Sequence, residues 1–123
     1  MSKQATGIRE DELARMCARW PGVTHALKWE VELVFSVANR NFVIFSTLGP
    51  DRGRLSFRAD PRHYGELSGM PGLAPAPFAA SPFWLRVVEP ERFTTEELAA
   101  HVRRSYEIVR ASLSPRLQAE LAD

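Results

Sequence analysis

The sequence predicts an α+β fold, in which helices pack on one face of an antiparallel β-sheet and leave the other face open. Three observations predict it. An amphipathic helical pattern opens the chain, several short strands joined by tight turns follow, and a long amphipathic helix comes near the end. The chain has 123 residues, which is enough for one domain, residues 1–123, with a hydrophobic core.

The first helix is predicted from residue 8 to residue 20. Its apolar residues recur at the spacing of one helical face: Leu13, Met16, Cys17 and Trp20. Pro21-Gly22 ends the helix. Three acidic residues, at 10–12, lie near its start, where the helix dipole favours negative charge. Cys17 lies on the apolar face, so we expect a small core residue rather than a nucleophile.

Four or five strands are predicted next, within residues 24–29, 33–38, 41–48, 54–58 and 83–88. Residues 38–41 form a tight hairpin turn, since Asn tolerates positive φ. The strand at 41–48 is apolar on both faces, so we expect it to be central. Strict alternation there places Phe42, Ile44 and Leu48 on one face and Val43 and Phe45 on the other. In the next strand Leu55 and Phe57 face inward.

Asp60-Pro61 predicts the start of a short helix, with Asp60 as N-cap. A Pro/Gly-rich surface loop follows at 69–77. The long helix begins at Thr94 or Thr95, where Thr94 and Glu97 fit a capping box. Its buried stripe is predicted to be Leu98, Val102, Tyr106, Val109 and Leu113, and a terminal helix from Ser114-Pro115 ends near Leu121. We expect the helices near 8–20 and 95–113 to share one sheet face, over a core that includes Trp20, Phe35, Phe57, Tyr106 and Val109.

Composition excludes several classes of protein. No apolar run approaches the ~20 residues that a membrane-spanning helix needs, and the N-terminus lacks a signal-peptide core. One cysteine cannot form an internal disulfide, so we expect a cytoplasmic protein. The net charge of +1 shows that the molecule as a whole is not a polycation.

No catalytic motif is present. The sequence has no phosphate-binding Gly-rich loop, Cys-x-x-Cys pair, His-Glu-x-x-His helix or nucleophile elbow. His25, His63 and His101 lie far apart on different elements, a spacing more typical of surface or half-buried residues than of metal ligands. We therefore expect a protein that is not an enzyme, with no catalytic residue, metal or cofactor.

Cations and aromatic residues are predicted to gather on the open sheet face. If Leu55 and Phe57 face the helices, Arg54, Ser56 and Arg58 face outward. By the same argument Trp84 and Arg86 point outward, and one of Lys28 and Trp29 joins them. Residues 39–63 carry five arginines, including Arg40 and Arg52 in turns, against two aspartates. Such a surface can pair with phosphates and stack on bases; alternatively, it is a solvated face whose Arg stems cover Trp rings.

Several short segments, in this order and spacing, resemble the MmcQ/YjbR family of bacterial proteins. They are Trp20-Pro21-Gly22-Val23, Lys28-Trp29, Val34-Phe35-Ser36-Val37 with Asn41-Phe42, Leu55-Ser56-Phe57, Ala74-Pro75-Ala76-Pro77-Phe78, Phe83-Trp84 and Ser105-Tyr106. Glu30 departs from the glycine that many members have after the Trp of the first strand. Ala38, Asn39 and Arg40 replace the usual Gly and Lys of the hairpin, which keeps a cation at Arg40.

The resemblance implies a CyaY-like (frataxin-like) sandwich and a "double wing" DNA-binding role. Frataxins bind metal through an acidic ridge, but here arginines dilute the acidic cluster at 10–12, so we interpret it as surface charge that matches the helix dipole.

Two functional hypotheses follow from these residues. The first is a nucleic-acid-binding module, favoured as a monomer, that uses eight residues: Lys28, Trp29, Arg40, Arg52, Arg54, Arg58, Trp84 and Arg86. The second is a module that binds a protein partner or a small ligand through the Pro-rich 70–78 loop. An enzyme is the third and weakest reading.

Overall fold

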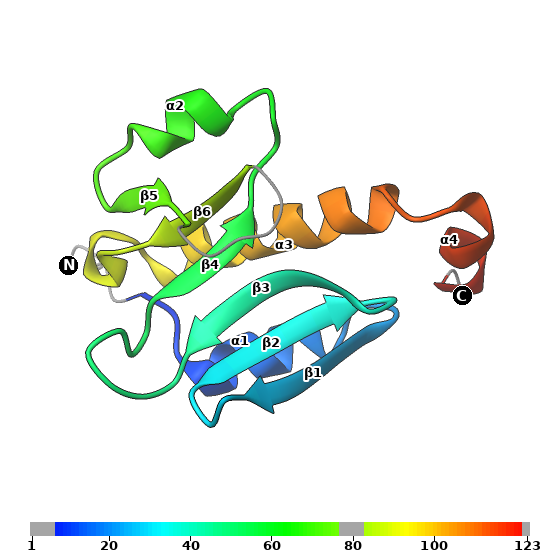
Figure 1. The fold of residues 1–123 in the computed structure, drawn as a ribbon, viewed down its shortest axis with the longest axis horizontal. Coiled ribbons are helices and arrows are strands. Elements are labelled where there is room, and N and C mark those ends of the chain that lie inside the picture. Colours follow the sequence, from blue (N-terminus) through cyan, green and yellow to red (C-terminus); the bar gives the residue numbers. More distant parts are fainter. Residues whose placement is uncertain (1–6, 77–82, 122–123) are drawn as a thin grey trace.

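The computed structural model describes residues 7–76 and 83–121 and confirms the α+β class. An antiparallel sheet of six strands has the order β1-β2-β3-β4-β6-β5 (Figure 1). The strands are β1 (Val23–Lys28), β2 (Glu32–Val37), β3 (Arg40–Ser46), β4 (Leu55–Arg58), β5 (Leu73–Pro75) and β6 (Trp84–Val87). β3 is central, as predicted. β5 lies in the segment predicted as a loop, because three residues that contain Pro75 give too short a pattern to recognise.

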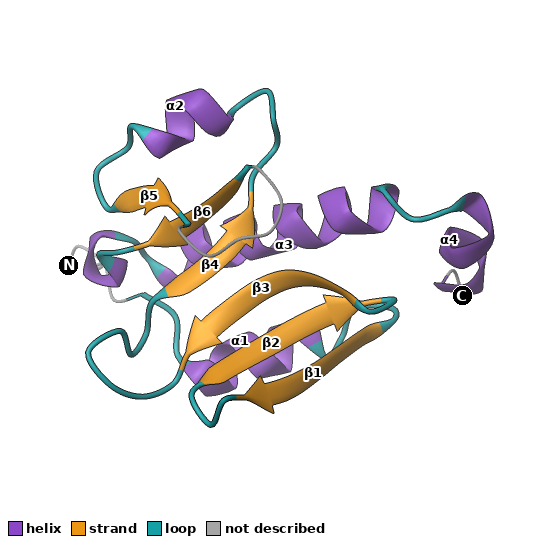
Figure 2. Cartoon of the chain, viewed as in Figure 1, coloured by secondary structure: helices purple, strands orange, loops and turns teal. Residues whose placement is uncertain are grey.

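The helices are α1 (Glu10–Cys17), α2 (Tyr64–Ser68), η1 (Pro90–Arg92), α3 (Thr95–Ala111) and α4 (Pro115–Leu121). Figure 2 shows α1 and α3 behind the same face of the sheet, which confirms the predicted layering. Their apolar residues form one buried cluster with the inward residues of the strands. Within the described residues, no helix is long and apolar enough to cross a bilayer.

α3 begins as the sequence predicts. The Thr94 hydroxyl accepts the Glu97 N–H at 3.1 Å, and the Glu97 carboxylate accepts the Thr94 N–H at 2.8 Å. This capping box satisfies two backbone donors that a helix start leaves unpaired. The predicted stripe of α3 is buried, although its last residue, Leu113, lies just beyond the C-cap Ser112.

α1 is shorter than predicted, and Asp60 does not cap α2. α1 ends at Cys17, so Trp20 lies in the following turn, where it is partly buried against the core as predicted. Cys17 is enclosed in the core, and burial raises the pKa of its thiol to about 12. α2 begins only at Tyr64, and Asp60 instead accepts the Arg62 N–H in the turn before the helix and bonds to the side chains of Arg62 and Arg104.

A bulge in β3 corrects the predicted alternation. Phe35 faces Val43 and Ser36 faces Asn41, so Phe42 is the extra residue on β3. The bulge turns Phe42 into the core beside Val43 and Phe45, whereas Ile44 stays on the opposite face. The extra residue explains the error, because strict alternation puts Phe42 and Ile44 on one face.

The hydroxyl of Ser105 joins α3 to the sheet at this bulge. Ser105 Oγ donates to the Phe42 carbonyl at 2.6 Å and accepts the Arg58 N–H at 2.9 Å. Val43 and Phe57 form the last paired position of β3 and β4 here, and Phe42 and Arg58 are the residues that flank it. The buried hydroxyl therefore bridges two backbone groups that the next ladder bond would otherwise join.

The neighbouring Tyr106 joins α3 to the turn after α1. Its hydroxyl donates to the Pro21 carbonyl at 2.7 Å. Its ring packs against Trp20, with centroids 5.1 Å apart, and edge-on against Phe42 at 5.4 Å. Arg103 lies over both Trp20 and Tyr106. Adjacent residues of one helix thus hold two separate parts of the chain.

Ser105→Ala is expected to lower the free energy of unfolding by about 2–4 kcal/mol, since each buried backbone group left without a partner costs about 1–3 kcal/mol. Urea unfolding measures it. Ser112→Ala is the matched control, because among the described residues the hydroxyl of the exposed Ser112 bonds only to the Val109 carbonyl at the end of its own helix. A loss for Ser105→Ala no larger than that of the control would contradict the bridging role.

His101 is expected to make folding pH-dependent. Its ring stacks on Phe57 at 4.9 Å, and burial lowers its pKa below 6.5, while Glu97 opposes part of the shift. As the pH falls below about 6.5, the unfolded chain therefore binds a proton at His101 more readily than the folded chain does, and the free energy of unfolding decreases. His101→Phe keeps a ring on Phe57, so denaturation at about pH 7.5, 6.5 and 5.5 should show a shallower fall. Equal falls for both proteins would refute this assignment.

Candidate nucleic-acid interface

Strand register defines which residues share the open sheet face. Ser56 pairs with Ile44 and with Arg86, and Arg58 pairs with Trp84. Since Leu55 and Phe57 are in the helix-side core, their neighbours along β4 lie on the opposite face. The open face thus carries Lys28, Glu32, Val34, Ile44, Arg54, Ser56, Arg58, Trp84 and Arg86. Val34 and Ile44 make its centre apolar.

A carboxylate from the β3–β4 loop neutralises part of this face. Asp51 Oδ1 accepts from Arg54 Nη1 at 2.8 Å, and Asp51 Oδ2 lies 3.1 Å from Arg86 Nη2. The three side chains are partly exposed, so solvent weakens the ion pairs. Sequence reasoning missed the role of Asp51. The separation of three residues from Arg54 was visible, but Arg86 comes within reach only through the β4–β6 pairing.

Arg58 and Trp84 lie side by side on the open face, but they are less exposed than predicted. Trp84 is only 8% exposed, so the prediction of an outward stacking ring is wrong. Trp84 does lie on the open face, as predicted, but its ring is buried there and is not available for stacking. Arg58 is half-buried, its inner Nε–H is enclosed without an acceptor, and in the described part of the chain its guanidinium makes no ion pair.

The other predicted residues lie at two ends of the sheet. Lys28, at the end of β1, belongs to the open face and lies opposite Glu32 of β2 in the strand register. Trp29 follows in the β1–β2 turn with φ 52° and is 79% exposed. Arg52 is exposed in the β3–β4 loop, at the same end of the sheet (Figure 1). Arg40 lies in the β2–β3 hairpin at the opposite end, so the structure does not bring it together with Lys28.

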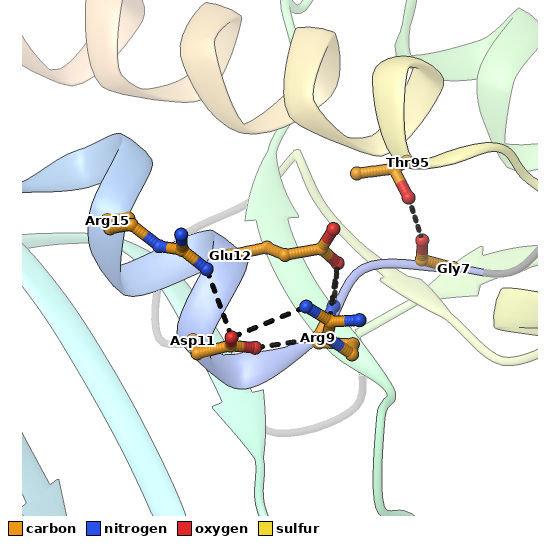
Figure 3. A network of polar contacts seen from close by, with 6 residues as sticks. All are labelled: Gly7, Arg9, Asp11, Glu12, Arg15 and Thr95. Carbon is orange, nitrogen blue, oxygen red and sulfur yellow. Dashed lines mark hydrogen bonds and ion pairs between the residues drawn. The ribbon is translucent and has the colours of Figure 1, made fainter.

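The acidic cluster at the start of α1 is engaged with the chain itself (Figure 3). Asp11 accepts from Arg9 at 3.1 Å and from Arg15 at 3.1 Å, and the hydrogen bond from Arg9 holds the pKa of Asp11 below its usual value. Glu12 accepts the Arg9 N–H at 2.9 Å, which caps the helix. These carboxylates thus neutralise neighbouring cations and helix donors. Across residues 7–76 and 83–121, no three metal-ligating side chains gather.

The Pro-rich segment is partly described. Met70 and Pro71 are exposed, Leu73 and Ala74 belong to β5, and residues 77–78 lie outside the described residues. Backbone bonds from Ala76 to Trp84 and from Val88 to Gly72 tie this segment to β6. Its described part is therefore an edge of the sheet rather than a free loop.

Comparisons with known proteins agree with this fold. The sequence model of the YjbR family matches residues 18–108, well over half of the chain. A Deinococcus radiodurans protein, DR2400, described as a DUF419 domain, superposes with a TM-score of 0.80 at 23% identity, covering 92% of this chain and 87% of that chain. A Pseudomonas syringae protein has a TM-score of 0.65 at 14% identity, covering 82% of this chain and 98% of that chain. No curated protein matches significantly. At such identities the structural likeness shows the fold alone.

Proposed function

The chain belongs to the YjbR family, and we propose that it is a binding module that contacts nucleic acid through the open face of its sheet. The contacts are to phosphates. Lys28, Arg52 and Arg58 contact phosphates without any rearrangement. Arg54 and Arg86 contact phosphates only when Asp51 moves away from them. This role corresponds to the DNA-binding function that the family resemblance implies.

One observation carries the proposal: cations from β1, β4 and β6 lie on a face that neither α1 nor α3 covers (Figure 2). Among the described residues, Lys28, Arg52 and Arg58 make no ion pair. Phosphate contacts release counterions from nucleic acid, so a few accessible cations suffice for weak, sequence-independent binding. The burial of Trp84 supports backbone contact over base stacking, and leaves Trp29 as the exposed aromatic of the set.

We also propose that the protein acts by binding rather than by catalysis. The one thiol is buried, and its raised pKa keeps it protonated and therefore a poor nucleophile. A cytoplasmic location belongs to the same proposal, because a single enclosed cysteine suits a reducing compartment.

Arg58→Ala is expected to weaken binding and reduce its salt dependence. Three phosphate contacts give a slope of log affinity against log salt concentration of about −2.7 for duplex DNA and about −2.1 for a single strand. The variant has one contact fewer, so each slope should become shallower by about one third. Fluorescence titration with random-sequence oligonucleotides across a salt series measures both slopes.

Arg116→Ala is the matched control for Arg58→Ala. It removes the same charge from α4, where Arg116 pairs with Glu120. Equal slopes for the two variants would show that only net charge matters, and no binding at low salt would refute the proposal.

Asp51→Asn is expected to strengthen binding. The substitution removes the negative charge shared by Arg54 and Arg86, so both become available to phosphates. Two more contacts would make the duplex salt slope steeper by about 1.8. Glu120→Gln, which removes the same charge from α4, should leave the slope unchanged. An unchanged slope for Asp51→Asn would exclude Arg54 and Arg86 from the interface.

The second candidate function is recognition of a protein or small ligand by the 70–78 segment. The observation in its favour is Met70, which is 40% exposed beside the exposed Pro71. Salt separates the two functions, because an apolar contact does not weaken steeply with added salt.

A further inference from the structure

The two edges of the sheet differ in how they resist pairing with another strand. The edge formed by β5 has three residues and ends in Pro75, which cannot donate to a ladder. The edge formed by β1 has six residues, no proline, and a single charged residue, Lys28, at its end. Five of its residues are exposed, and only Val23 is half-buried. Within residues 7–76 and 83–121, β1 therefore presents a long row of backbone donors and acceptors with no strand beside it.

β1 also exposes an apolar side chain on the helix side of the sheet. Leu27 is 56% exposed, although it pairs with the buried Leu33 of β2. His25 is exposed beside it, with one face of its ring packed on Phe35 at 5.4 Å. Neither residue is covered by α1. A strand added to this edge would bury Leu27 and satisfy the backbone groups of β1 at the same time.

We infer that β1 pairs with β1 of a second copy of this chain, antiparallel and centred on Ala26, to give one continuous sheet. With a two-fold axis perpendicular to the sheet, the helix-side faces of both copies lie on the same side of the joined sheet. Residues that lie opposite one another across the two β1 strands must therefore project from the same face. Centred on Ala26, it sets Leu27 against the partner's His25 and Lys28 against the partner's Thr24. All of residues 24–28 then pair, and no like charges meet.

The alternative centres fit less well. A pairing centred on His25 sets two titratable rings against each other at the axis. A pairing centred on Leu27 extends only over residues 26–28, because Trp29 and Glu30 have φ of 52° and 64° and leave the extended conformation. Ala26, with the smallest side chain of the strand's interior, is the residue that an axis accommodates most easily.

The expected dimer is weak. It is therefore compatible with the monomer predicted from the sequence, which should predominate at low concentration, and it should form only at high concentration. Five paired residues on each side are fewer than the ~20–30 residues per side of a stable interface. The pairing does not depend on nucleic-acid binding. It would place the open faces of both copies on the same side of one sheet.

Cysteine cross-linking tests the register. Facing residues of antiparallel strands have Cα atoms about 4.5–5.5 Å apart, within disulfide range, so Ala26→Cys should form a covalent dimer on mild oxidation. Thr24→Cys is the control, because the two copies of Thr24 would lie more than about 13 Å apart. We expect cross-linking of Ala26→Cys to be at least about tenfold faster. Equal rates would overturn the proposal.

A charge substitution tests the pairing without a covalent bond. Ala26→Lys places two lysines face to face at the axis, whereas Leu48→Lys adds the same charge at an exposed residue outside β1. In sedimentation velocity from about 10 µM to about 500 µM, the wild type and Leu48→Lys should gain mass with concentration, and Ala26→Lys should stay monomeric. A wild type that stays monomeric throughout, or an Ala26→Lys variant that associates equally, would overturn the inference.

Discussion

The hydroxyl of Ser105 is the contact on which the arrangement of the sheet depends. It bridges the Phe42 carbonyl and the Arg58 N–H, so it fixes α3 over β3 and β4 and holds the bulge that turns Phe42 inward. Phe42 and Arg58 are both residues of the sheet, but the Phe42 side chain faces the helix-side core and the Arg58 side chain lies on the open face. The backbone of Arg58 is held from the helix side, which leaves its side chain on the open face. One buried hydroxyl thus connects the core to the candidate interface.

Because α1 and α3 lie on one face of the sheet, the molecule has two unlike surfaces. The helix side buries the aromatic cluster of Trp20, Phe42 and Tyr106 under Arg103. The open side keeps an apolar centre at Val34 and Ile44, with cations around it and Asp51 between Arg54 and Arg86. The face is therefore only modestly basic, and its character depends on whether Asp51 holds its two partners. Asp51 thus neutralises part of the positive charge of this face.

Most of the fold could be predicted because it follows from local patterns. The stripe of α3, its capping box and the alternation of β4 each depend on a few adjacent residues. The predictions were wrong where contacts between residues far apart in the sequence determine the local structure. The bulge exists because an extra residue fits opposite β2, and β5 forms only because β6 is there to pair with it. Likewise, Arg54, Arg58 and Arg86 could be assigned to one face, but neither the burial of Trp84 nor the pairing of Asp51 with Arg86 is visible in sequence.

The open face, and not the helix side, is the surface that we propose to receive nucleic acid. The most direct test is an NMR titration of labelled protein with a short oligonucleotide, following backbone amides and arginine Nε–H signals. The largest shifts are expected on Lys28, Arg52 and Arg58, while the signals of the exposed helix arginines Arg103 and Arg116 should stay unchanged. Shifts confined to the helix side, or to Met70 and its neighbours, would contradict this proposal.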